Sequence, residues 1–334
     1  MNYNPLVLVT GATGVLGPSV VAELVKANYR IRTLSLDHPA VGILPVKVET
    51  CVGDVTDRNT VQDAMVNVDA VIHLAALLHI TNPPSNMRIK YEKVNVGGTA
   101  NVVDAAVKSG VRRVVFFSTI AVYGNTKGQV VNENTEPHPD TIYGETKLAA
   151  EHLVLKARDA YGRPLGTVLR LAAVYGSRIK GNYQQLLRAL NSGWFIPVGN
   201  GLNRRTLIYD KDVAHAAFLA LQHPVAAGKV FNVSDGKIHS MQYIISTMCQ
   251  ALDRKAPYVY LPAGHVRSAI KIIEKAAHVI GLQSPISCSL LDKYMEDLAV
   301  EAKLIQEELR FAPKFDLYSG WREAVQEMRN LYEL

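Results

Sequence analysis

A tyrosine and a lysine four residues apart, Tyr143 and Lys147, have types and spacing that suit proton transfer. On a helix, residues at this spacing share one face, with their side chains roughly 6 Å apart. A tyrosine is a poor base at neutral pH because its ordinary pKa is about 10, but a neighbouring ammonium favours the phenolate. The pair could therefore take a proton from a substrate hydroxyl while a hydride leaves the same carbon, or run the reverse reaction.

Two hydroxyl side chains, Ser118 and Thr119, end the apolar run that begins at Val111. This run is predicted to be a strand, and the carboxyl ends of parallel strands face the ligand crevice. Thr119 could therefore hydrogen-bond the reacting oxygen, with Ser118 as the alternative.

Three glycines, Gly11, Gly14 and Gly17, lie between an apolar run at 6–10 and a helical pattern at 15–27. Glycine permits a tight turn and the close approach of a pyrophosphate to the positive end of the helix. Their spacing is GxxGxxG rather than the GxGxxG of the standard dinucleotide fingerprint. The loop favours a dinucleotide cofactor.

The residues that end the second predicted strand bear on which cofactor is bound. An acidic residue there binds the 2′-hydroxyl of NAD, whereas an arginine accommodates the 2′-phosphate of NADP. The segment reads Ser35-Leu36-Asp37-His38, and Arg32 lies within the strand. Asp37 favours NAD, although a solvated loop residue is its alternative interpretation, and NADP stays possible.

The elements that must position these residues alternate through the first half of the chain. Apolar, β-branched runs are separated by segments with helical spacing, which predicts parallel βαβ units and an α/β, Rossmann-type doubly wound sheet. The expected strands are 6–10, 31–36, 46–52, 70–74, 111–118 and 166–173, and the main expected helices are 15–27, 91–109 and 141–161.

After residue 176 this alternation stops. We expect loop and short strand over 194–208, a strand at 230–233 that could rejoin the sheet, and helices at 182–191, 212–222, 240–252, 264–281 and 301–309. The predicted cofactor domain covers 1–176 and is rejoined by about 207–236. A smaller, mostly helical substrate domain is expected over 177–206 and 237–334. Apolar residues in 264–281 suit core packing, with a hydrophobic pocket or contact with a membrane surface as alternatives.

The composition excludes several classes of protein. Hydrophobic residues make up 48% and charged residues 20% of the chain, as in globular proteins. The net charge of +6 suits an anionic ligand and is too mild for nucleic acid. The sequence has no apolar window long enough to span a membrane and no signal peptide, so a cytoplasmic protein is expected. The cysteine and histidine spacings match no zinc motif, so no metal is expected.

Several segments together resemble the extended short-chain dehydrogenase/reductases, in particular the branch of nucleotide-sugar epimerases, dehydratases and reductases. The similarity covers nearly the whole chain. It comprises TGATGVLG at 10–17, GDVTD at 53–57, HLAA at 73–76, NVGGT at 95–99, FFSTIAVYG at 116–124, YGETK at 143–147 and LRLAAVYG at 169–176.

The resemblance implies roles for residues in these segments. Thr119, Tyr143 and Lys147 would be the catalytic triad, and Tyr143 and Lys147 would also contact the cofactor, with Lys147 on the nicotinamide ribose. The other cofactor residues would be Gly11, Thr13, Gly14, Val15, Leu16 and Gly17 at the pyrophosphate, Asp37 at the ribose, Asp54 and Val55 beside the adenine, Leu74, Ala75, Ala76 and Asn95 along the cofactor, and Val174 near the nicotinamide.

The second half implies where a nucleotide sugar would bind. The segment 178–183 resembles the one in which Asn182, with Lys180, meets the nucleotide diphosphate. The loop 197–206 resembles one whose arginine, here Arg204 or Arg205, grips that diphosphate bidentately. Solvated loop charge is the alternative interpretation for both arginines.

The closest resemblance is to enzymes that act at C4 of UDP-N-acetyl-hexosamines. The expected activity is therefore a UDP-sugar 4-epimerase, and the alternative is a reductase of 4-keto-6-deoxy nucleotide sugars in polysaccharide biosynthesis. A hydroxysteroid or flavonol type dehydrogenase, and a cofactor-binding protein without catalysis, are further alternatives. Ala173 replaces an asparagine common in the epimerases, which weakens that assignment, and Ile120 and Ala121 lack the acids of dehydratases. The resemblance also implies a homodimer through helices at 91–109 and 141–161.

Overall fold

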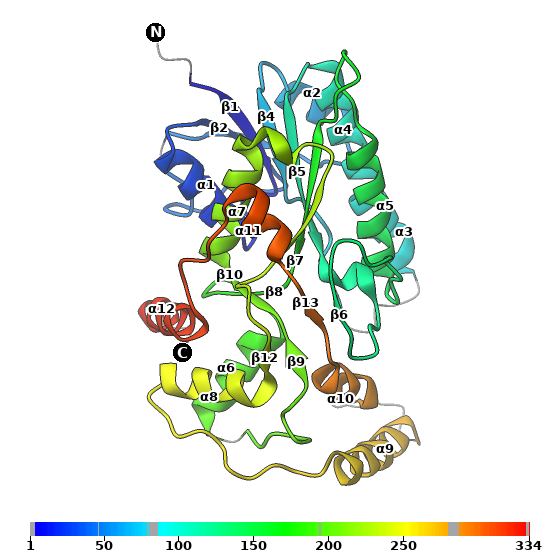
Figure 1. The fold of residues 1–334 in the computed structure, drawn as a ribbon, viewed down its shortest axis with the longest axis vertical. Coiled ribbons are helices and arrows are strands. Elements are labelled where there is room, and N and C mark those ends of the chain that lie inside the picture. The colour runs from blue at the N-terminus through cyan, green and yellow to red at the C-terminus, as the bar shows by residue number, and fades with distance from the viewer. Residues whose placement is uncertain are drawn as a thin grey trace.

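A seven-stranded sheet with strand order β11-β7-β5-β4-β1-β2-β3 forms the centre of the molecule (Figure 1). The computed structural model describes residues 4–45, 47–78, 80, 86–193, 195–279, 287–331 and 334. Every pairing in this sheet is parallel, which confirms the predicted fold class. The strands are β1 (Leu6–Thr10), β2 (Arg30–Ser35), β3 (Glu49–Val52), β4 (Ala70–His73), β5 (Arg113–Thr119), β7 (Gly166–Leu171) and β11 (Val230–Val233).

Helices cover both faces of the sheet, because alternate residues of each buried strand point to opposite sides. Val7 and Val9 of β1 share a core with α1 (Gly17–Lys26), α7 (Asp210–Gln222) and α11 (Lys303–Leu309). Leu6 and Leu8 face α2 (Arg58–Ala64) and α4 (Gly98–Lys108). On the same face as α2 and α4, helix α5 (Ile142–Lys156) packs on β5 and β7.

From β1, the next strands β2 and β3 extend the sheet toward one edge, whereas β4, β5, β7 and β11 extend it toward the opposite edge. This reversal of strand order lies between β1 and β4, and ligands of doubly wound sheets bind at that point, beyond the carboxyl ends of the strands. The glycine loop, the end of β4 and the end of β5 therefore all reach the same edge.

Several predicted boundaries were wrong. The helix predicted at 91–109 consists of α3 (Met87–Tyr91), a π-helical segment η1 (Glu92–Gly97) and α4. The helix predicted to reach 161 ends at Lys156, because Arg158 bridges to Pro164 and the chain turns back into β7. Helices α2, α10 (Cys288–Met295) and α12 (Leu317–Asn330) were not predicted.

A second core lies beyond the sheet, around α6 (Asn182–Ser192), α8 (Met241–Ala251) and α12. Short strand pairs connect it to the rest: β8 (Ala173–Tyr175) with β10 (Leu207–Tyr209), β9 (Arg204–Arg205) with β12 (His239–Ser240), and β6 (Val130–Val131) with β13 (Ala299–Val300). Two short 3-10 helices are η2 (Ile120–Tyr123) and η3 (Pro224–Ala226). Helix α9 (Ala263–Val279) lies with α10 at the end of the molecule away from the sheet (Figure 1). Within the described residues, none of the helices is both long and apolar enough to cross a membrane.

Candidate active site

The glycine loop after β1 is packed too closely for any side chain at Gly11. Its φ angle is +73°, and a Cβ placed there would lie 2.8 Å from the backbone nitrogen of Ala75. The Gly11 N–H donates to the Leu34 carbonyl over 2.7 Å, and the Gly14 N–H donates to the Gly11 carbonyl over 3.0 Å. The loop is thereby held between the ends of β1, β2 and β4.

The first turn of α1 suits a bound pyrophosphate. The N-cap residue, Leu16, makes no side-chain cap, and the first turn contains no acidic residue. A Cβ on Gly17 would lie 2.0 Å from the Ala12 carbonyl oxygen, so glycine is needed for the helix to begin this close to the loop. An uncapped helix N-terminus presents N–H groups and a positive dipole, which is the environment that a dinucleotide phosphate requires.

We expect Gly11→Ala to weaken NAD binding at least tenfold, because the added methyl collides with the backbone of Ala75 at the cofactor loop. Gly162→Ala is the matched control, since Gly162 also has a positive φ of +78° but open space around it. The control should cost about 1 kcal/mol of folding free energy and leave NAD affinity unchanged. Calorimetric titration with NAD measures the affinity of both variants, and urea denaturation measures their stability. Equal NAD affinities in the two variants would contradict the packing argument.

The end of β2 contacts the loop through Ser35 rather than through a charged residue. Ser35 is buried, and its hydroxyl accepts a hydrogen bond from the Thr13 N–H over 3.3 Å. Asp37 is exposed in the turn that follows, and its contact with a ribose stays a prediction. Arg32 is bound by Glu49 over 2.9 Å and by the Val66 carbonyl over 2.6 Å.

A buried histidine joins the ends of β1 and β4. His73 Nδ1 lies 2.6 Å from the Thr10 hydroxyl and its Nε2 lies 3.0 Å from the Thr99 hydroxyl. Thr99 donates to the Asn95 carbonyl, so its oxygen accepts from Nε2–H, and Thr10 donates to Nδ1. Burial, together with the charge on Lys147, lowers the pKa of His73 to about 3, and the neutral ring serves this structural network. No group of metal-ligating side chains was found among the described residues.

Asn95, in the π-helical segment, connects the loop after β4 to α5. Its side-chain oxygen accepts from the Leu77 N–H over 2.7 Å, and its side-chain nitrogen donates to the Thr146 hydroxyl over 3.1 Å. Thr146 directly precedes Lys147. The buried amide thus positions both the segment after β4, of which residues 74–76 are predicted to line the cofactor, and the helix that carries the tyrosine and lysine.

Tyr143 and Lys147 lie one turn apart near the start of α5, as their spacing predicts. The Thr141 hydroxyl caps this helix by accepting from the Gly144 N–H over 3.1 Å. The Lys147 ammonium is buried and lies 4.0 Å from the centre of the Phe116 ring. The Tyr143 ring meets the Tyr91 ring edge to face, with their centres 6.4 Å apart.

Burial controls the ionisation of this pair in the protein alone. It raises the pKa of Tyr143, with a smaller contribution from Tyr91. It also lowers the pKa of Lys147 to about 7, although the carboxylate of Glu151 opposes that shift. The lysine is therefore poised to lose its proton near neutral pH, and the phenol needs added positive charge to ionise.

Thr119 and Ser118, at the end of β5, point to different surroundings because neighbouring strand residues face opposite sides. The Thr119 oxygen accepts from the Ala121 N–H over 3.2 Å, which leaves its own proton available to a ligand. A Cβ on Gly144 would lie 2.8 Å from the Ala121 carbonyl oxygen, so the turn after Thr119 packs against the start of α5. This geometry brings Thr119 to the same edge as Tyr143.

Ser118 instead belongs to a buried ionic network. It donates to Glu151 over 2.5 Å, and Glu151 binds the Arg170 guanidinium over 2.7 Å. Arg170 also donates to the Tyr123 hydroxyl over 3.0 Å. The alternative catalytic role considered for Ser118 has no support in this placement.

The other residues predicted to contact the cofactor lie on several segments of the fold. Val55 is buried beside Gly98, while Asp54 is exposed and accepts from the Thr56 N–H over 2.8 Å. Residues 74–76 are partly buried after β4, and Val174 is partly buried in β8. Their contacts with a cofactor stay predictions.

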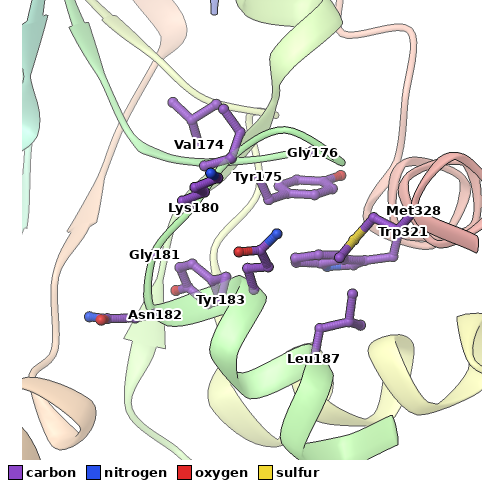
Figure 2. Close-up of a pocket in the computed structure, with 12 residues that line it drawn as sticks. Val174, Tyr175, Gly176, Lys180, Gly181, Asn182, Tyr183, Leu187, Trp321 and Met328 are labelled. Carbon is purple, nitrogen blue, oxygen red and sulfur yellow. The ribbon is translucent and has the colours of Figure 1, made fainter. Parts of the chain in front are cut away.

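A cavity of about 110 Å³ lies where β8 leads into α6 (Figure 2). Val174, Lys180 and Asn182 all border it, so the structure brings together these three residues from separate predictions. Its inner wall holds Tyr175 stacked on Trp321, with ring centres 4.4 Å apart. The Asn182 side chain extends away from this stacked pair in Figure 2.

Trp321 and Met328, which complete the cavity, are residues that the sequence interpretation missed. They come from α12, whose buried positions repeat at helical spacing: Leu317, Gly320, Trp321, Ala324, Val325 and Met328. That periodicity, following Asp316 as an N-cap, is the signal that could have identified the helix.

Arg204 and Arg205 do not border this cavity. Arg204 is paired with Asp297 over 3.1 Å, and Arg205 is paired with Glu296 over 3.2 Å. Arg205 also donates to the Lys293 carbonyl over 2.5 Å. Both guanidiniums thus hold the segment that follows α10, and binding of a diphosphate by either one stays a prediction.

Comparison with known proteins agrees with this architecture. Residues 7–234 match the NAD dependent epimerase/dehydratase family. The chain is 31% identical to N-acetyl-alpha-D-glucosaminyl-diphospho-ditrans,octacis-undecaprenol 4-epimerase of Escherichia coli O157:H7, covering 78% of this chain and 76% of that one. It is 28% identical to UDP-glucose 4-epimerase of Vibrio cholerae, covering 96% and 94%.

Among solved structures, MoeE5 in complex with UDP-glucose and NAD matches with a TM-score of 0.75 and 26% identity, over 98% of this chain and 99% of that one. UDP-glucose 4-epimerase of Thermotoga maritima with UDP-glucose has the same fold, with a TM-score of 0.79 at 23% identity over 98% and 100% of the two chains. The glycine loop, the uncapped start of α1 and the Tyr143–Lys147 pair fit the cofactor of this family. The chain is therefore an enzyme of the NAD-dependent epimerase/dehydratase family, an extended short-chain dehydrogenase/reductase that uses NAD.

Proposed function

We propose that this enzyme is a 4-epimerase of a UDP-sugar. The observation that carries the proposal is the Tyr143–Lys147 pair on α5, in which Lys147 is buried and Tyr143 partly buried. The pair lies at the sheet edge that also presents Thr119 and the glycine loop. Two curated relatives, at 31% and 28% identity, are named as 4-epimerases.

In this proposal Tyr143 takes the proton of the C4 hydroxyl, and Thr119 donates a hydrogen bond to the same oxygen. Lys147 stabilises the phenolate by its charge. When bound, NAD would supply the hydride acceptor and, in its oxidised form, a positive charge that offsets the effect of burial on Tyr143. The keto-sugar then rotates in the site, so that the hydride returns to the opposite face of C4. Tyr143 returns its proton to the C4 oxygen in that step. Lys147 is buried and Tyr143 partly buried, which limits the access of water to the reacting atoms.

The nucleotide part of the substrate would bind beyond the sheet. We propose that Lys180 and Asn182 meet the diphosphate at the cavity mouth, because both residues border the cavity beside β8. Arg204 and Arg205 would contribute by holding the 288–297 segment, or by exchanging Asp297 or Glu296 for the diphosphate. This assignment implies the division into a cofactor domain over 1–176 with 207–236 and a substrate domain over 177–206 and 237–334. The homodimer through the helices of 91–109 and 141–161 is proposed on the same basis of resemblance.

One observation favours a second candidate, a reductase of 4-keto sugars. Ala173 occupies a β8 position beside Val174, where the resemblance to 4-epimerases leads us to expect an asparagine. A reductase would exchange its cofactor in each turnover, whereas an epimerase can retain it.

The test is a product assay with purified protein and no added cofactor, using UDP-glucose, UDP-N-acetylglucosamine and, separately, N-acetylglucosaminyl-diphospho-undecaprenol as substrates. We expect interconversion with the C4 epimers, together with release of NAD from the denatured protein. If only N-acetylglucosaminyl-diphospho-undecaprenol is converted, the enzyme is still a 4-epimerase, but its substrate is a lipid-linked sugar rather than a UDP-sugar. If none of these sugars is converted, but added NADH is oxidised in the presence of a 4-keto nucleotide sugar, the enzyme is a reductase and the epimerase proposal is wrong.

A further inference from the structure

The outer side of α9 is apolar and exposed. Ile270 is buried against the protein, whereas Ile272 is 70% exposed and Ile273 is 43% exposed. These two isoleucines project from a helix that lies at the far end of the molecule, beside α10 and away from the sheet (Figure 1). A helix that only packs on its own protein would carry polar residues at these positions, and packing among the described residues does not account for the two isoleucines.

The loop that leads into α9 also carries exposed apolar side chains. Tyr258 is 94% exposed and Val259 is 52% exposed. The loop is anchored to the body of the protein, because Leu261 exchanges backbone hydrogen bonds of 2.9 Å with Pro197 and Gly199. We refer to Tyr258, Val259, Ile272 and Ile273, with Lys271 and Lys275, as the α9 surface.

The charge of the same segment is strongly positive. Residues 254–279 contain five arginine and lysine residues and one acidic residue, a net charge of +4. One of the five, Arg267, is paired with Asp292 of α10. The acidic residue, Glu274, is turned inward and accepts from the Cys288 N–H over 3.1 Å. Lys271 and Lys275 are exposed, one turn apart, on the flank of the helix next to Ile272.

We propose that the α9 surface binds the surface of an anionic phospholipid bilayer. Exposed isoleucines beside a lysine stripe form the pattern of a helix that lies in the membrane interface, and an exposed tyrosine suits the headgroup level. Lysines gain free energy near anionic lipids, whereas a second copy of this chain would bring like charges together.

The test is co-sedimentation of the full-length protein with vesicles of phosphatidylcholine alone or mixed with phosphatidylglycerol. We expect binding to the anionic vesicles only, and weaker binding at high salt. Lys271→Glu with Lys275→Glu should reduce the partition coefficient at least tenfold. Ile272→Asp should also reduce it severalfold, whereas Ile89→Asp, which changes an isoleucine 75% exposed on α3, should not.

Circular dichroism and melting temperature show whether the variants stay folded, which their exposure predicts. Absence of wild-type binding to anionic vesicles would overturn the proposal, and so would equal binding by the α9 variants. Dimerisation in the ultracentrifuge that Ile272→Asp abolishes, without vesicle binding, would assign the surface to a second copy instead. None of these measurements depends on turnover, so they are independent of the proposed epimerase activity.

Discussion

Tyr143→Phe is expected to lower kcat about 10³-fold or more while the protein stays folded and binds NAD. The substitution removes only the phenolic oxygen, which is the atom proposed to exchange a proton with the substrate. The ring and its edge contact with Tyr91 would remain, so the packing of α5 is preserved. Steady-state turnover, calorimetric NAD titration and the melting temperature measure the three parts of this expectation.

Tyr161→Phe is the matched control. Tyr161 follows the same helix but is 83% exposed, so removal of its hydroxyl should leave kcat within about twofold of wild type, as for surface substitutions in general. If Tyr143→Phe kept turnover near the wild-type value, Tyr143 would lose its proposed role and the proton would have to pass through another group. Loss of NAD binding in that variant would show instead that the hydroxyl supports the cofactor.

Glu151→Leu is expected to lower the free energy of unfolding by about 3–5 kcal/mol, because it leaves a buried guanidinium without its partner. The side chains of Glu151 and Arg170 are only 1% and 6% exposed. Glu151 also accepts the Ser118 hydroxyl, which would lose its partner as well. Urea denaturation measures the difference, and most of it should appear in the midpoint rather than the slope.

Combining Glu151→Leu with Arg170→Met should recover part of this loss, since the double variant buries no unpaired charge. Arg30→Ala provides the contrast. Arg30 is 58% exposed in its pair with Glu49, so that variant should cost less than about 1 kcal/mol. Equal destabilisation by Arg30→Ala and Glu151→Leu would refute the assignment of the Glu151–Arg170 pair as a buried, mutually dependent pair.

The sheet and the cofactor loop could be predicted from the sequence because their signals are local. Apolar runs such as Leu6–Thr10 and Val230–Val233 form strands with those bounds. A glycine at position 11 predicts a tight turn wherever the rest of the chain lies, and the structure has the positive φ that requires it. The four-residue spacing of Tyr143 and Lys147 likewise defines one helix face without reference to any distant residue.

The sequence by itself therefore determined the parallel sheet, the glycine loop and the tyrosine–lysine pair. Only the tertiary structure decided which side chains face the crevice, because a strand covered on both faces is apolar on both and its orientation cannot be read from its pattern. Ser118 joins Glu151 and Arg170, whereas Thr119 accepts from the Ala121 N–H in the turn that packs against the start of α5. Arg204 and Arg205 bind Asp297 and Glu296, more than ninety positions away, through contacts that no local spacing encodes.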